Sequence, residues 1–215
     1  TNMIMTYNGN PVNAFYHASN GGISAPASES WEMKDYPYFL TKYDFIGAGN
    51  NQFKSFNKNE KSLRNFIFDK NNKYLGSKHY LFRWTKKIAS TQIINLINEQ
   101  NSSFQKDKTI DLKIIERGKS GRVIKLEIRQ SGRLEPLILN KDDIRKYLKF
   151  LPSNLFIIDK LNDDFWVFTG GGFGHGVGLS QSGAIEMAKL GFNYERILGH
   201  YYEGINITDF KSIKR

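Results

Sequence analysis

The stretch between residues 170 and 184, GGGFGHGVGLSQSGA, contains seven glycines and one histidine. Glycine has no Cβ, so it reaches positive φ and permits close approach, but ordering it costs more conformational entropy than ordering other residues. The stretch therefore predicts a loop whose backbone lies against a ligand, and we interpret it as part of a functional site. Its glycines lack the spacing of dinucleotide-binding loops and the Gly-Lys-Ser/Thr ending of a P-loop, which leaves nucleotide binding as a minor alternative.

Short apolar segments alternate with turn residues along the rest of the chain. Asn8-Gly9 favours a tight hairpin turn between 3–7 and 12–17, because both residues tolerate positive φ. Further strands are expected at 110–116, 123–128, 134–139, 155–158, 165–169 and 205–210, an extended segment at 80–88, and helices at 90–97 (capped by Ser90), 144–150, 179–190 and 194–202. The 215 residues, 40% of them hydrophobic, suffice for one core. These features predict an α+β fold: one β-rich domain, residues 1–215, with antiparallel hairpins, meanders and several short helices.

Positive charge is concentrated in one part of the chain. The net charge is +10, and residues 54–87 contribute ten basic and two acidic residues, with aromatic residues between them. This mixture occurs in nucleic-acid-binding proteins, but no nucleic-acid-binding motif accompanies it here. An anionic cell-wall glycan fits the charge equally well. We therefore expect no nucleic-acid partner and interpret residues 44–76 as a basic insertion.

The chain has no cysteine and four histidines. Disulfide bonds and thiolate metal sites are thereby excluded, and the histidines alone give weak support for a metal. No apolar run is long enough to span a bilayer. Because the chain begins at Thr1 without a signal peptide, we expect that this start was produced by cutting a longer chain.

Two blocks of sequence resemble one known family. The first is GFGHGVGLSQSGA at residues 172–184, followed by HYYEG at 200–204, and the second is FYHASNGGIS at 15–24. Both are similar to segments of the stage II sporulation protein D family, also called the amidase-enhancer family, and the segment 77–84 resembles a further element of it. The chain departs from the family at Gly171, where a basic residue is common, and at Ser182, where an aromatic residue is common.

The resemblance implies a bacterial, extracytoplasmic cell-wall protein that acts on peptidoglycan glycan strands. Sporulating members are lytic transglycosylases, which need one carboxylic acid of raised pKa. In the family this acid lies before the first hairpin, so we expect no catalytic acid in this chain, and we interpret Glu29 and Glu32 as loop residues. The alternative is a non-catalytic glycan-binding or amidase-enhancing module, with an amidase as partner. Whether the chain belongs to an enzyme stays open, and we expect these 215 residues alone to be inactive.

The resemblance also implies candidate site residues. His175 is expected to contact sugar hydroxyls or to orient the missing acid, and its alternative role is a loop histidine bonded to backbone. The two glycine-containing loops are expected to face one cleft. The predicted substrate-binding residues are His17, Ser19, Gly21, Gly22, Gly174, Gly176, Ser180 and Gln181. For the last two, capping of the following helix is the alternative.

Other polar and aromatic residues are interpreted as structural. We expect Trp31, Trp84, Tyr201 and Tyr202 to pack in the core rather than stack on sugars. His79 and His200 receive the same interpretation. Some members of the family bind zinc through cysteine and histidine, but without cysteine we expect neither zinc nor another cofactor here.

Overall fold

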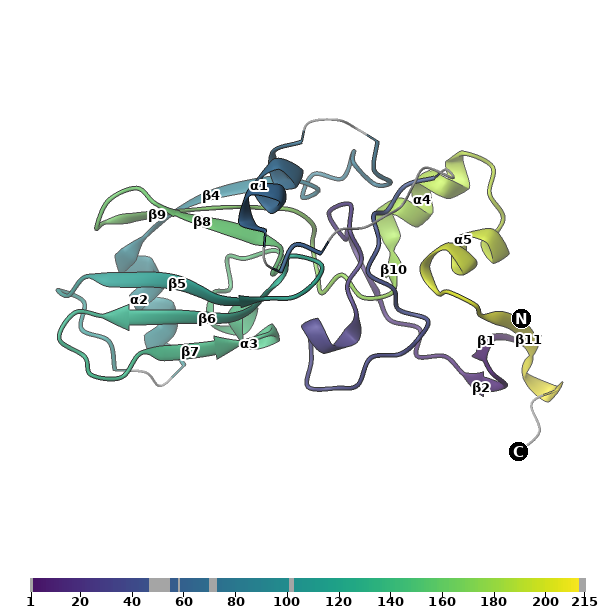
Figure 1. Ribbon diagram of the computed structural model, residues 1–215, viewed down its shortest axis with the longest axis horizontal. Coiled ribbons are helices and arrows are strands. Elements are labelled where there is room, and N and C mark those ends of the chain that lie inside the picture. Colours follow the sequence, from purple (N-terminus) through teal and green to yellow (C-terminus); the bar gives the residue numbers. More distant parts are fainter. Residues whose placement is uncertain (1, 47–54, 58, 70–72, 101–102, 213–215) are drawn as a thin grey trace.

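Two three-stranded antiparallel sheets form one end of the elongated molecule, and two helices with short strands form the other (Figure 1). The computed structural model describes residues 2–46, 55–57, 59–69, 73–100 and 103–212. The predicted α+β class is confirmed: helices and antiparallel sheets share one compact domain. None of the helices in these ranges is long and apolar enough to cross a membrane.

The first sheet is the predicted meander. Its order is β5-β6-β7, and every neighbouring pair is antiparallel. Its strands are β5 (Ile110–Arg117), β6 (Val123–Gln130) and β7 (Leu137–Asn140). Leu126 and Ile128 alternate with polar residues along β6 and are fully buried, as expected when one sheet face covers a core. The third strand starts later than predicted, and Leu134 is 93% exposed.

The second sheet has the order β4-β9-β8. Its strands are β4 (Trp84–Ala89), β8 (Phe156–Lys160) and β9 (Phe165–Gly170). The predicted strand pair is confirmed as the β8–β9 hairpin, where the Asn162 side chain accepts hydrogen bonds from the N–H groups of Asp164 and Phe165. The extended segment predicted from residue 80 begins only at Trp84, because residues 80–83 form turns.

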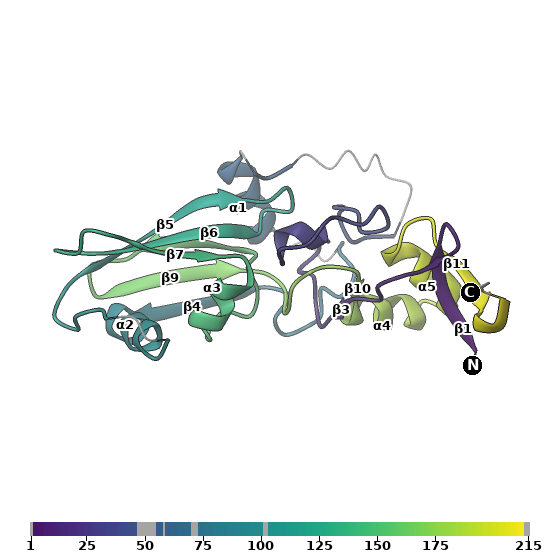
Figure 2. The same ribbon diagram turned by 90° about the horizontal axis from the view of Figure 1, so that it is seen from below.

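One apolar core fills the space between the two sheets, and helices α2 and α3 help to enclose it (Figure 2). Helix α2 (Ser90–Asn98) contributes Ile93, Ile94 and Ile97, each at most 1% exposed. Ser90 is the first helical residue rather than the cap, and its hydroxyl donates to the Asp163 carbonyl. Helix α3 (Asp142–Tyr147) begins with two acids near its positive N-terminal dipole and ends before the predicted residue 150.

The stretch 44–76 contains a helix that the sequence analysis did not predict. Helix α1 (Glu60–Phe68) starts after Asn59, whose side chain accepts a hydrogen bond from the Ser62 N–H at 2.9 Å. It buries Leu63, Phe66 and Ile67 in a second core. Described parts of this stretch therefore help to build the core. The remaining parts, 47–54, 58 and 70–72, lie outside the described residues, so the insertion stays a prediction.

The other end of the molecule carries both chain termini (Figure 1). The turn at Asn8-Gly9 is confirmed, with φ of 49° and 79°, but the second hairpin strand is short. The next strand pairs in parallel with a strand from the glycine-rich stretch instead. The elements here are β1 (Met3–Tyr7), β2 (Asn10–Pro11), β3 (Tyr16–His17), β10 (Leu179–Ser180), α4 (Gln181–Lys189), α5 (Tyr194–Tyr201), β11 (Asn206–Asp209) and the 3₁₀ turns Ala27–Glu29 and Phe210–Ser212. The predicted last strand is confirmed as β11, which pairs with β1.

Candidate functional site

The two glycine-containing loops, residues 19–25 and 170–178, are interlocked. The Ser19 N–H donates to the Phe173 carbonyl at 3.1 Å, and the Phe173 N–H donates back to the Ser19 carbonyl at 2.7 Å. A Cβ added at Gly21 would lie 2.7 Å from the backbone carbon of Gly171. The glycines therefore bring one loop's backbone against the other loop. The loops lie together, in direct contact through their backbones, and their facing one cleft stays a prediction.

Buried and half-buried side chains hold both loops through hydrogen bonds to their carbonyl groups. Arg122 donates from Nη2 to the carbonyls of Asn20 (3.0 Å) and Ile23 (3.1 Å). Arg83 donates from Nη1 to the Gly21 carbonyl at 2.8 Å. Trp84, expected in the core and 7% exposed, donates its indole N–H to the carbonyl of Gly172. The loop carbonyl groups that have no partner in a sheet thus accept hydrogen bonds from these side chains.

Two side chains with charged groups, Arg122 and Glu29, are buried close to the first loop. Arg122 is 1% exposed, and burial lowers its pKa to about 10. Burial also raises the pKa of Glu29, whose carboxylate accepts hydrogen bonds from the hydroxyl and N–H of Ser120. The negative charge of Glu29 partly offsets the loss of hydration at Arg122. This geometry agrees with the interpretation of Glu29 as a residue that orders a loop.

His175 has backbone partners on both ring nitrogens. Nδ1 accepts from the Val177 N–H at 3.1 Å, so Nε2 carries the proton and donates to the Tyr16 carbonyl at 3.0 Å. The ring packs against Trp31 with centroids 4.6 Å apart. Burial lowers the pKa of His175 to about 4. The neutral imidazole therefore holds a loop in place, which corresponds to its alternative, structural role.

Folding stability is expected to fall in weak acid because of this histidine. Its pKa is about 4 in the folded protein, against an ordinary value of 6.5, so the unfolded chain binds more protons between these values. The contribution of neutral His175 to the free energy of unfolding is fully present above pH 6.5. It is lost as the pH falls toward 4, by about 1 kcal/mol per pH unit. Urea denaturation at pH 7.5 and 5.0 measures the loss. His175→Gln should reduce it, and an identical pH dependence in that variant would contradict the assignment.

Most of the predicted substrate-binding residues lie in the interlocked region. Ser180 does not cap α4 with its side chain; its hydroxyl lies 3.4 Å from the Asn20 N–H. Gln181, the first residue of α4, is exposed. His17, Ser19, Gly21, Gly22, Gly176 and Ser180 are buried, and Gly174 and His175 are half-buried. Their role in substrate binding stays a prediction, and Gln181 is the one with the most accessible side chain.

A groove of about 420 Å³ lies along α4, and we call it the α4 groove. Helix α4 supplies Gln181, Ser182, Ile185 and Glu186, and the turn at 76–79 supplies the opposite wall. The Glu186 carboxylate accepts from the Gly76 N–H at 2.7 Å, which fixes that turn against the helix. A Cβ at Gly76 would overlap the Ser182 side chain. The small residues at this contact let the helix and the turn approach closely.

His79 lines the α4 groove, and the ring of Tyr80 packs beside it. His79 lines this groove rather than packing in the core, and its ring lies 4.7 Å from that of Tyr80, which is 76% exposed. The His79 Nδ1 accepts from the Leu81 N–H, so a neutral ring keeps its N–H on Nε2. Sequence reasoning missed both residues as site candidates, although the resemblance at 77–84 pointed to their segment.

Asp44 joins the first loop to α5. It is 2% exposed and accepts hydrogen bonds from the Asn20 amide and from His200 Nε2, both at 2.7 Å, and from the Tyr201 hydroxyl at 3.2 Å. Tyr201 and Tyr202 are buried, as expected. Nothing in the local sequence marked Asp44, because its partners are distant in the chain.

The described residues contain no group of three or more histidine, aspartate or glutamate side chains arranged to hold a metal ion. The expectation of no zinc and no other cofactor stays a prediction.

Several curated proteins are similar to this chain in sequence. An alignment of 232 residues with the amidase enhancer of Bacillus subtilis is 22% identical and covers 96% of this chain and 31% of that protein. The stage II sporulation protein D of Bacillus amyloliquefaciens is 45% identical over 53 residues, 25% of this chain and 15% of that protein. An uncharacterized protein of Brachyspira hyodysenteriae is 29% identical over 134 residues, 61% of this chain and 34% of that protein.

The chain belongs to the family described as a domain of unknown function, DUF8618, which matches residues 25–178. It spans about a third or less of the length of these curated relatives. The resemblance to amidase enhancers and stage II sporulation protein D is confirmed at the level of sequence similarity.

Proposed function

We propose that this chain is a bacterial cell-wall module that binds peptidoglycan glycan strands in the α4 groove. Support comes from its similarity to an amidase enhancer along nearly its whole length and from its local similarity to stage II sporulation protein D. The groove includes residues of the block 172–184, which carries the resemblance, and the exposed Gln181 belongs to both.

The side chains of the α4 groove carry the proposal. Gln181 and Ser182 offer amide and hydroxyl groups that pair with sugar hydroxyls, while Ile185 offers an apolar surface. The exposed ring of Tyr80, which packs beside His79, is suited to stacking on a sugar face. Lys78 and Lys189 add positive charge, which attracts the carboxylates of muramic acid. Binding is therefore expected to weaken as salt is added.

A cell-wall ligand implies an extracytoplasmic protein, and we propose that location for this protein. The similarity to an amidase enhancer makes an amidase the second proposed partner. In this arrangement the module holds glycan while a separate enzyme cuts nearby bonds.

Lytic transglycosylase cleavage is the second candidate function, favoured by the similarity to stage II sporulation protein D. The chemistry needs a carboxylic acid that stays protonated near neutral pH. The Glu29 carboxylate is buried and hydrogen-bonded to Ser120, so we do not assign it as the acid. We propose that the acid comes from sequence before Thr1. The enzyme would be favoured if a longer protein releases anhydro-muramic products while the 215-residue chain is inactive. The binding module would be favoured if neither protein is active.

Replacing Gln181 by alanine is expected to weaken binding to peptide-free peptidoglycan strands about five-fold, because it removes one or two hydrogen bonds to the sugar. Calorimetry with purified strands measures the effect. Gln92→Ala is the matched control, since Gln92 is also exposed near the start of a helix but lies on α2, outside the groove. Equal affinity of both variants and the unchanged protein would contradict a role for the groove.

A further inference from the structure

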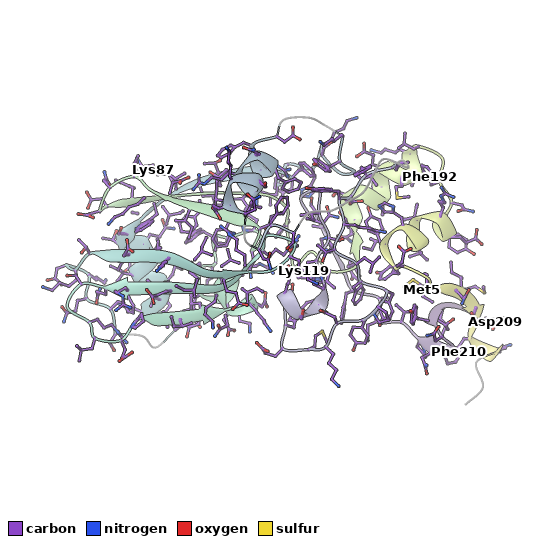
Figure 3. All side chains as sticks on the ribbon, viewed as in Figure 1. Met5, Lys87, Lys119, Phe192, Asp209 and Phe210 are labelled. Carbon is purple, nitrogen blue, oxygen red and sulfur yellow. The ribbon has the colours of Figure 1, made fainter. Side chains whose placement is uncertain are left out.

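A second cavity, of about 810 Å³, opens on another side of α4 and has no part in the proposed glycan site. We call it the α4–α5 cavity. It lies between the two helices and the segment 42–46, and Figure 3 shows Phe192 where the chain passes from one helix to the other. Its volume is in the range of ligand-binding pockets.

Apolar side chains line much of the α4–α5 cavity. Phe45 and Ile46 come from the segment after Asp44, Met187 comes from α4, and Phe192 follows it. Ile46 is 43% exposed, so apolar surface is open to solvent here. A ligand with an apolar side chain gains free energy by covering such surface.

Arg196 supplies a cation at the rim that no carboxylate of the described residues neutralises. It is exposed, and its guanidinium lies 5.9 Å from the centre of the Phe192 ring. Within the described part of the chain, no carboxylate comes within ion-pair distance of it, whereas Lys42 is paired with Glu203 at 3.3 Å. Glu195, next to it in sequence, accepts from the Asn193 side chain instead. Arg196 is therefore available to a carboxylate ligand, which a guanidinium binds through two parallel hydrogen bonds.

His200 supplies an oriented acceptor in the same cavity. Its Nε2 lies 2.7 Å from the buried carboxylate of Asp44, so this nitrogen carries a proton and the ring orientation is fixed. In the neutral ring the other nitrogen, Nδ1, is then an acceptor. The side chain is 18% exposed and lines the cavity, so the acceptor is suited to a ligand N–H group.

We propose that the α4–α5 cavity binds a short peptide that ends in a carboxylate next to an apolar side chain. Arg196 binds the carboxylate, the apolar side chain covers Phe45 and Phe192, and a peptide N–H donates to His200. A fatty acid shares the apolar part and the carboxylate but has no N–H group, so the oriented imidazole favours the peptide. The proposal does not depend on glycan binding in the α4 groove.

Calorimetry on the full 215-residue chain tests the proposal with N-acetyl-Leu-Leu and its C-terminal amide. The free carboxylate is expected to bind at least ten-fold more tightly than the amide. Arg196→Gln should remove this difference, and the fold should tolerate it because the side chain is exposed. Arg129→Gln is the matched control, because that arginine is also exposed but lies on β6 beside Glu127, and it should keep the ten-fold difference.

A peptide methylated on its last amide nitrogen tests the proposed contact between a peptide N–H group and His200. It lacks the N–H that His200 would accept and is expected to bind several-fold more weakly than the unmethylated peptide. Equal binding of the carboxylate and amide peptides, or no binding of either at millimolar concentration, would overturn the proposal. Tighter binding of laurate than of the peptide, with the same dependence on Arg196, would also overturn it in favour of a fatty acid.

Discussion

Gly21→Ala is expected to lower the free energy of unfolding by about 3 kcal/mol, from strain at positive φ and from overpacking. Gly21 has a φ of 68°, and an added Cβ would lie 2.7 Å from backbone atoms of Gly171 and Gly172. Backbone atoms cannot rotate away as a flexible side chain can, so the two loops must separate to accept a methyl group. Urea denaturation followed by circular dichroism measures the change.

Gly132→Ala is the matched control for this substitution. Gly132 has a φ of 79°, but nothing lies within 4 Å of the position that its Cβ would occupy. It should lose only about 1 kcal/mol, the cost of placing a side chain at positive φ. The difference between the two variants in the free energy of unfolding measures the cost of separating the two loops. Equal losses would mean that the loops do not interlock as described.

Arg122→Met is expected to lower the free energy of unfolding by about 4 kcal/mol. The methionine fills much of the space but donates no hydrogen bond, so the carbonyls of Asn20 and Ile23 lose their donor and Glu29 loses its nearby positive charge. Chemical denaturation at pH 7.5 measures the loss. Arg129→Gln, on an exposed arginine, should change stability by less than about 0.5 kcal/mol.

A double variant tests the electrostatic part of this account. With Glu29→Gln already present, Arg122→Met should cost about 1 kcal/mol less than it does alone, because no buried negative charge is left unbalanced. A loss below 1 kcal/mol for Arg122→Met alone would contradict the view that this arginine fastens the first loop.

Local patterns predicted the regular elements well. The alternation in β6 and the Asn-Gly turn depend on neighbouring residues, and both are confirmed. Helix α1 was missed because it lies among asparagines and lysines, although Asn59 followed by Leu63, Phe66 and Ile67 has the cap and spacing of an amphipathic helix. The parallel β3–β10 pair was missed because its two strands lie far apart in the chain. Since Tyr16 and His17 pair with β10, the second strand of the hairpin is shorter than predicted.

The candidate site was predictable only in part, for the same reason. The glycine-rich stretch indicated close approach of backbone, and close approach is what the structure shows, but the neighbour is the loop at 19–25. No local pattern links Gly21 to Gly171, nor Asp44 to His200. The α4 groove and the α4–α5 cavity arise only when distant segments pack together.

A nuclear magnetic resonance titration with peptide-free peptidoglycan strands tests the proposed function most directly. The proposal predicts that backbone amide signals of Gln181, Ser182 and Ile185, and of the turn at 76–79, shift in proportion to the bound fraction. Signals from the outer strands of the β5-β6-β7 sheet should stay unchanged and serve as the internal control. No shifts at saturating glycan, or shifts confined to surfaces away from α4, would contradict it.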